Sequence, residues 1–169
     1  MSGKWFDRRF DLGLAPHSAR EIFDRLRTAP DRLAATVEGL PVEQLTRRRD
    51  GKWSIQENAG HLYDLESLWD KRLDDYARGA ETLHPADLEN RKTHEANHNA
   101  RPISEILDAF RSARAAIMEK LIRLTPAELS RTALHPRLQQ PMTVVDLAYF
   151  VAEHDDHHLA AIRELRSLH

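Results

Sequence analysis

Near the C-terminus, side chains spaced for one face of a helix form an apolar stripe that two histidines interrupt. Alternating steps of three and four residues select Val144, Leu147, Val151, His154, His158, Ala161, Leu165 and Leu168. Such positions share one face of an α-helix, and six of these eight are apolar, so the face is predicted to be buried. An imidazole is costly to bury without a partner. His154 and His158 therefore need a partner inside the protein, and our hypothesis is a metal ion.

Three earlier segments show the same helical periodicity. The four predicted helices cover residues 18–40, 54–78, 103–124 and 143–167. Ser54 and Glu57 have the spacing of a capping box at a helix start, and Gly79 offers a stop at the other end. Pro30 lies inside the first segment, where it predicts a kink or a break. Few glycines and little strand-like patterning accompany these segments, so we predict an all-α fold, a four-helix bundle.

The connections between the predicted helices differ in length. Residues 125–128 form a second capping-box pattern with proline at the first helical position, which predicts a short extra helix ending near Ser130. The links at 79–102 and 130–142 are long, and such links are uncommon unless they have a function. They also permit crossovers, so a simple up-down-up-down order does not follow. Nothing divides residues 1–169 into repeats or separate parts, which predicts a single helical domain.

Composition narrows the class of protein and the chemistry open to it. The chain has no cysteine, which excludes disulfides, thiolate ligands and cysteine nucleophiles. Its 25 basic and 27 acidic side chains nearly balance, so they give no general attraction to nucleic acid or to an anionic membrane. The sequence shows no signal-peptide pattern and no apolar run as long as a membrane span. We expect a cytoplasmic protein whose partner is a small-molecule substrate.

Ten histidines provide two pairs at i, i+4 spacing, His154/His158 and His94/His98. Chance alone gives about 0.6 such pairs in a chain of this composition, so spacing by itself is weak evidence. Burial favours His154/His158 as metal ligands, although carboxylates on facing helices could also satisfy them. His61, on the apolar edge of the second helix, is the best candidate for a third ligand. Three neutral imidazoles leave one coordination position open for water or a thiol, as in catalytic metal sites.

The second pair matches a different motif. His94, Glu95 and His98 have the spacing of the zinc-peptidase pattern, in which two histidines flank a general-base glutamate. The surrounding residues are polar, and Pro102 limits a helix there. The sequence therefore favours a polar loop or short helix with exposed histidines. A further alternative is that this loop folds over the metal site and contacts the substrate.

Five residues close to the predicted ligands in sequence are candidates for the surroundings of the site. Asp64, Glu153 and Asp155 could accept the second ring N–H of a ligand histidine, although each also fits an ordinary surface charge. Trp53, just before the second helix, could line a pocket or fill the core. His157 is one residue off the stripe, which favours a neighbouring or surface group over a ligand. No catalytic residue is assigned.

Two stretches of the chain resemble the DinB/YfiT-like superfamily of small bacterial bundles. They are WSIQENAGHL at residues 53–62 and HDDHHLAAI at residues 154–162, and the likeness in helix order extends over nearly the whole chain. The family's three histidines match His61, His154 and His158. The resemblance implies a four-helix bundle with an unusual helix order, often a homodimer, holding a divalent ion that is typically nickel or zinc.

The resemblance also implies a class of activity. Family members catalyse transfer or isomerisation with a low-molecular-weight thiol such as bacillithiol or mycothiol, and others are described as metal-dependent hydrolases. The loop at residues 83–99 cannot be mapped onto a member of known activity, so the specific reaction does not transfer. We expect a metal-dependent enzyme acting on a small molecule, of thiol S-transferase or hydrolase type. The alternatives are a non-catalytic, stress-associated binding or scaffold bundle and the zinc peptidase.

Overall fold

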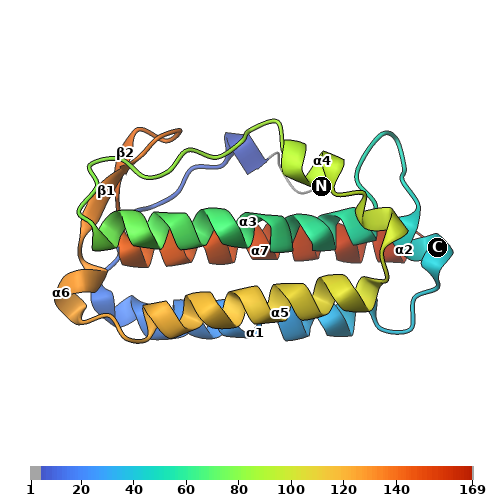
Figure 1. Cartoon of the computed structure of the whole chain (residues 1–169), viewed down its shortest axis with the longest axis horizontal. Coiled ribbons are helices and arrows are strands. Elements are labelled where there is room, and N and C mark those ends of the chain that lie inside the picture. The colour runs from blue at the N-terminus through green and yellow to red at the C-terminus, as the bar shows by residue number, and fades with distance from the viewer. Residues whose placement is uncertain (1–4, 169) are drawn as a thin grey trace.

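The computed structural model describes residues 5–168 and contains a bundle of four long helices (Figure 1). They are α1 (Ala19–Val37), α3 (Ile55–Ala77), α5 (Ile103–Leu121) and α7 (Val144–Ser167). The predicted all-α, four-helix fold is confirmed, and each helix agrees with its predicted segment to within a few residues at either end. Among the described residues, no helix combines the length and the apolar character needed to cross a membrane.

The order of the helices around the bundle is not a simple up-down-up-down arrangement. α1 packs against α5 and α7, and α3 packs against the same two helices. The sequence neighbours α1 and α3 therefore lie on a diagonal, as do α5 and α7. The colours in Figure 1 show that α1 and α7 run in one direction and α3 and α5 in the other. The chain must consequently return along the bundle between α3 and α5, which explains why that link is long.

The starts of the helices follow the local sequence. The Ser54 hydroxyl accepts the backbone N–H of Glu57, and the Glu57 carboxylate accepts the N–H of Ser54. The same reciprocal arrangement precedes α6 (Pro126–Leu129), which confirms the predicted short helix, and α7. Each pair satisfies amides that a helix start leaves free.

α1 runs unbroken through Pro30, so the break that the sequence allowed does not occur. Proline has no N–H to donate to the carbonyl one turn earlier, which belongs to Leu26. Arg114 on α5 supplies the missing donor, because its Nη1 lies 3.0 Å from that oxygen. The guanidinium is buried and is also paired with Glu66 on α3 and Asp155 on α7. One side chain thus joins all four long helices at the level of the proline.

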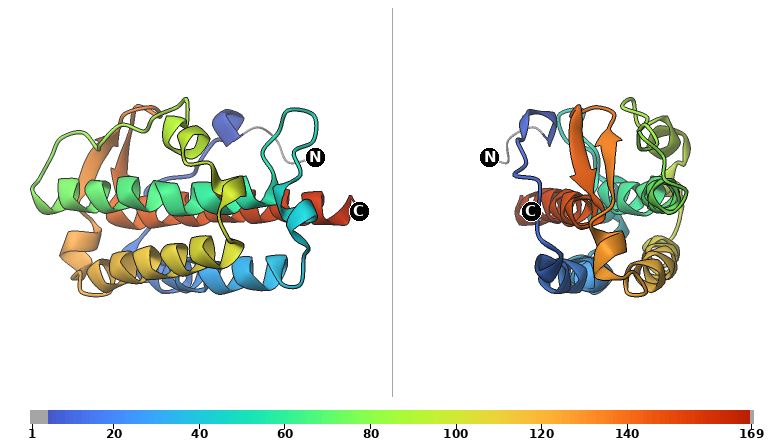
Figure 2. Two further views of the ribbon diagram at one scale, coloured as in Figure 1. Left: turned by 45° about the vertical axis from the view of Figure 1, so that its right-hand side comes forward. Right: turned by 90° about the vertical axis from the view of Figure 1, so that its left-hand side faces the viewer.

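The connecting segments contain short elements that sequence periodicity did not reveal. They are η1 (Trp5–Asp7), η2 (Pro16–Ser18), α2 (Val42–Thr46), α4 (Arg91–Glu95), η3 (His98–Ala100), β1 (Thr132–His135) and β2 (Gln140–Thr143). The two strands pair antiparallel over the predicted 130–142 link, and β2 extends one residue beyond it, to Thr143. Strands of four residues are too short to identify from alternation alone. In the end-on view of Figure 2, the hairpin, the α3–α5 link and the N-terminal segment lie over the layer formed by α3 and α7.

Candidate metal centre

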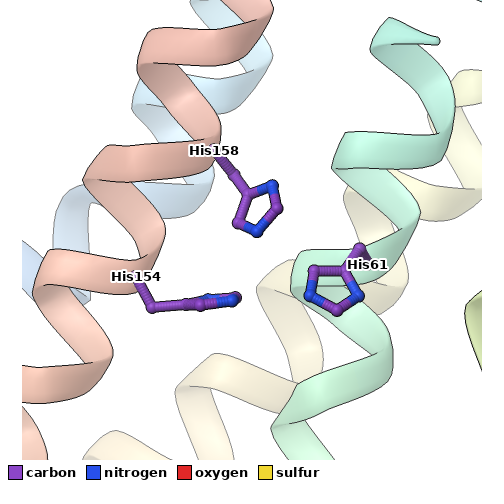
Figure 3. Close-up of side chains that lie close together, drawn as sticks. All are labelled: His61, His154 and His158. Atoms are coloured by element: carbon purple, nitrogen blue, oxygen red, sulfur yellow. The ribbon is translucent and has the colours of Figure 1, made fainter. Parts of the chain in front are cut away.

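Three histidine side chains converge between α3 and α7 (Figure 3). His61 comes from α3, and His154 and His158 come from successive turns of α7. One potential ligand atom from each residue lies within 4.8 Å of the other two. The side chains are buried, with 3%, 4% and 9% of their surface exposed. The structure thus brings the three predicted ligands together, while metal binding stays a prediction.

A neighbouring amide orients the His158 ring. The Asn58 Nδ2 donates to the backbone carbonyl of Ser54 at 2.8 Å, which leaves its Oδ1 facing His158 Nδ1 at 2.9 Å. An amide oxygen can only accept, so Nδ1 of the ring must carry the proton. The lone pair of the neutral ring is therefore on Nε2, where it is available to a cation.

The same logic applies to His61. The Thr93 hydroxyl donates its one hydrogen to Asp64 Oδ2 at 2.9 Å. It must therefore accept from His61 Nδ1, which lies 2.9 Å away. These hydrogen bonds again leave the lone pair of the neutral ring on Nε2, where it could bind a metal ion. Thr93 lies in α4 of the long link, so the link helps to fix the tautomer of His61, a predicted metal ligand.

The third ring, His154, is buried between aromatic side chains. Its centroid lies 5.1 Å from the Trp5 ring and 5.9 Å from the Trp69 ring. Its Nδ1 has no hydrogen-bond partner among the described residues. An unpartnered buried ring nitrogen is unfavourable, and a bound ion would give this imidazole a partner.

Burial also fixes the charge of the cluster. Desolvation lowers the pKa of His61 to about 4 and holds the pKa values of His154 and His158 well below the ordinary value. All three rings are therefore neutral near pH 7, which is the form of imidazole that binds metal. Three neutral donors in close contact fit a divalent cation, and their chemistry suits zinc, nickel, iron or copper.

The carboxylates predicted to contact the ligand rings lie elsewhere. Asp64 reaches His61 only through Thr93, and it also faces His98 Nε2 at 2.8 Å. Glu153 forms ion pairs with Arg8 and Arg25 instead of accepting from a ring N–H. Asp155 is likewise directed away from the histidines, toward the buried guanidinium of α5. Residues adjacent in a helical sequence project in different directions, which is why the prediction for the residues beside His154 was wrong.

Two other candidates do border the site. Trp53 lies 4.7 Å from the His61 ring and stacks at 6.2 Å on the His158 ring, so it is a pocket wall. His157 is half-buried, with its ring 5.2 Å from His158 and 5.6 Å from Trp5. Burial, followed by the positive charge of Arg8, lowers the pKa of His157.

The zinc-peptidase alternative does not fit the geometry. α4 ends at Glu95, and Asn97 adopts a left-handed conformation with φ of 48°, so the two histidines do not share a helix face. His94 is exposed, whereas His98 is 1% exposed and directed toward Asp64. The prediction that both are exposed is therefore wrong for His98. The loop does fold over the three-histidine site, as the alternative interpretation proposed.

The three histidines open onto a cavity of about 360 Å³. α3 and α7 form its floor, and the N-terminal segment, the α3–α5 link and the turn of the β-hairpin form its walls. Most of the lining is aromatic or aliphatic, including Trp5, Trp69 and Phe150, with Arg72 and Arg137 at one end. Sequence reasoning did not identify these arginines, nor Asn58 and Thr93, because their contacts join segments distant in the chain.

Comparisons with known proteins connect this geometry to a family. Residues 25–162 match the model of the DinB superfamily. A search among curated proteins finds no match. Among solved structures, YfiT from Bacillus subtilis superposes with a TM-score of 0.82 and 22% identity, covering 95% of this chain and 92% of that one. It is described as "a probable metal-dependent hydrolase with an unusual four-helix bundle topology".

Two further structures share the fold at lower identity. A mycothiol-dependent maleylpyruvate isomerase aligns with a TM-score of 0.67 and 10% identity, over 87% of this chain and 62% of that one. A protein from Streptococcus pneumoniae aligns with a TM-score of 0.68 and 13% identity, over 95% and 93% of the two chains. At these identities the likeness concerns the fold alone.

Proposed function

The chain belongs to the DinB superfamily, and from that premise we propose that it is a metal-dependent enzyme acting on a small molecule. The proposed ligands are His61, His154 and His158, and the proposed ion is nickel or zinc. The observation that carries the proposal is the placement of three buried, neutral imidazoles at the edge of a cavity of about 360 Å³. Cavities of this size suit small ligands.

A divalent ion held by three imidazoles would act as a Lewis acid with a position open to water or a thiol. The reaction is therefore a hydrolysis or a thiol-dependent transfer. The YfiT structure is described as a probable metal-dependent hydrolase and the isomerase as mycothiol-dependent, which supports proposing a hydrolytic or a thiol-dependent reaction. A low-molecular-weight thiol as co-substrate and a homodimeric assembly are parts of the same proposal.

The protein's own residues orient the ligand set and surround it with apolar surface. Asn58 and Thr93 keep the protons of two rings on Nδ1, so that the Nε2 lone pairs of these rings would be available to hold an ion. Trp5, Trp53 and Trp69 cover the histidine rings with apolar surface. A largely apolar surround strengthens the electrostatic effect of any bound charge.

The test is the metal content of protein purified without an affinity tag, measured by mass spectrometry. We expect close to one divalent ion per chain, lost in His154→Ala and retained in His94→Ala. His94 is a matched control because it is an exposed histidine outside the cluster. Metal at background level after growth in metal-replete medium, or equal loss in both variants, would contradict the proposal.

A further inference from the structure

The cavity extends past His154 to a wall that carries positive charge. Arg72 on α3 and Arg137 on the turn between β1 and β2 both line it. The Trp69 ring lies between this wall and the histidines, 5.4 Å from Arg72 Cζ and 5.9 Å from the His154 ring centroid. A ligand lying along Trp69 would therefore reach the arginines at one end and the candidate metal centre at the other.

Neither guanidinium forms an ion pair with a carboxylate of the described residues. Arg72 is 1% exposed, and its Nε donates to the backbone carbonyl of His84 at 2.9 Å. Arg137 lies over the Phe6 ring, and its Nη2 is buried without a hydrogen-bond partner. Burial lowers the pKa of both, that of Arg72 to about 10. A guanidinium group nevertheless keeps its charge at neutral pH. A buried cation without an ion-pair partner, as Arg72 is, and a buried guanidinium nitrogen without an acceptor, as in Arg137, are both unfavourable.

His135 adds a third donor to the same wall. Its Nδ1 accepts the backbone N–H groups of Arg137 and Leu138, at 3.3 and 3.1 Å. The neutral ring must therefore carry its proton on Nε2. That nitrogen lies 3.2 Å from Arg72 Nη1, which is also a donor. Two donors face each other without an acceptor between them, an arrangement that an anionic oxygen would relieve.

The nearby carboxylates are already engaged. Asp87 is the only acidic side chain that lines the cavity among the described residues. It accepts the backbone N–H groups of Glu89 and Arg91. Asp75, on the same helix as Arg72, is paired with Arg78 and accepts the backbone N–H of His84. Neither carboxylate forms an ion pair with Arg72 or Arg137, although the nearby charge of Asp75 acts to raise the pKa of Arg72.

We propose that Arg72, His135 and Arg137 form a subsite for the carboxylate of a small, partly apolar substrate. The apolar body of that substrate lies against Trp69 and Phe150, and its other end reaches the three histidines. The position of the reactive end depends on the proposed function, whereas recognition of the carboxylate depends only on this wall. Charge-assisted hydrogen bonds from guanidinium groups are well suited to a carboxylate.

The experiment measures binding of benzoate and hexanoate to metal-free protein by isothermal titration calorimetry. Benzamide and hexanamide, of the same shapes but without charge, serve as the reference ligands. We expect the carboxylates to bind and to exceed their amides by roughly tenfold or more in affinity, since two cations face them. Absence of carboxylate binding, or equal affinity for acid and amide, would overturn the subsite.

Variants locate the binding. Arg137→Gln, at a half-buried turn position, should lower the affinity for benzoate at least tenfold and leave the affinity for benzamide unchanged. His135→Asn should weaken benzoate too, because asparagine can still accept the turn amides but lacks the Nε2 donor. Arg123→Gln, an exposed position after α5, makes the same change of charge and should bind benzoate like the unmodified protein. Unchanged benzoate affinity in Arg137→Gln would overturn the subsite.

The two proposals fail in different ways. Metal content is not expected to change in Arg137→Gln, because that residue belongs to the far wall. If the protein takes up no metal but binds benzoate in a way that depends on Arg137, the subsite is supported and the proposed function is contradicted. Benzoate binding that requires added zinc and ignores Arg137 would place the carboxylate on the ion and overturn the subsite.

Discussion

At the candidate metal centre, the tautomer of each of two histidine rings is fixed by one neutral side chain. Asn58 and Thr93 accept from Nδ1 of His158 and His61, and so direct the lone pairs of both rings away from themselves. Because neither acceptor carries a charge, neither favours the imidazolium form, which cannot bind a cation. Asp64 acts at one remove through the Thr93 hydroxyl, and therefore orients His61 without charging it.

Replacement of Thr93 by valine tests this arrangement at a single residue. The variant keeps the shape of the side chain but removes the hydroxyl between His61 and Asp64. We expect zinc affinity to fall roughly tenfold to a hundredfold, the usual effect of losing such an orienting hydrogen bond. Competition with a chromogenic chelator would measure it. Thr93→Ser retains the hydroxyl and should stay near the original affinity, whereas an unchanged affinity in Thr93→Val would contradict the argument.

At the scale of an element, α1 depends on a partner in another helix. Proline in a helix interior costs about 3 kcal/mol, partly because a carbonyl loses its donor. In α1 the carbonyl of Leu26 instead accepts from Arg114, whose remaining donors bind Glu66 and Asp155. The continuity of the helix and the burial of two carboxylates therefore depend on the same guanidinium.

A double-mutant cycle on Pro30 and Arg114 measures this coupling. Arg114→Met leaves two buried carboxylates unpaired and should cost roughly 3–5 kcal/mol in the free energy of unfolding. Pro30→Ala restores an N–H that can serve Leu26, so it should help more when Arg114 is absent, by about 1 kcal/mol. Urea denaturation of the four proteins gives the coupling. The same effect of Pro30→Ala in both backgrounds would show that the two residues act independently.

The sequence alone predicted those parts of the molecule whose structure depends on residues close together in the chain. The long helices follow from apolar periodicity and from caps such as Ser54, all read within a few residues. The three histidines were found because helix faces are also a local property. Asn58 and its partner are 100 positions apart, and Arg137 enters the cavity on a hairpin turn, so neither could be placed. Glu153 was misplaced because proximity in sequence was taken for proximity in space.

At the scale of the whole molecule, the α3–α5 link is held on α3 by a series of buried contacts. Gln56 donates to the backbone carbonyls of His98 and Arg101, and the Ser54 hydroxyl donates to Asn99. The His98 ring lies directly over Gly60, in the space that a side chain would otherwise occupy. Because the same link carries the threonine bound to His61, docking of the link and the state of the metal centre are coupled.

Gly60→Ala therefore tests the docking of the whole link. Glycine to alanine in a helix interior ordinarily stabilises by roughly 0.5–1 kcal/mol. Here the new methyl group would overlap the buried His98 ring, so we expect the opposite sign, a loss of about 1–3 kcal/mol from overpacking. Urea denaturation measures the loss. Hydrogen exchange should also quicken in residues 91–101, and zinc affinity should fall as the link moves away from His61.

Removal of the opposing ring provides the control. In the double variant Gly60→Ala with His98→Ala, the overlap disappears and the usual preference of alanine for a helix returns. The Gly60→Ala change should then be neutral or stabilising relative to His98→Ala alone. The reversal of sign distinguishes a steric effect of this ring from a general intolerance of α3 to substitution. Stabilisation by Gly60→Ala in the original background would mean that the link does not rest on this glycine.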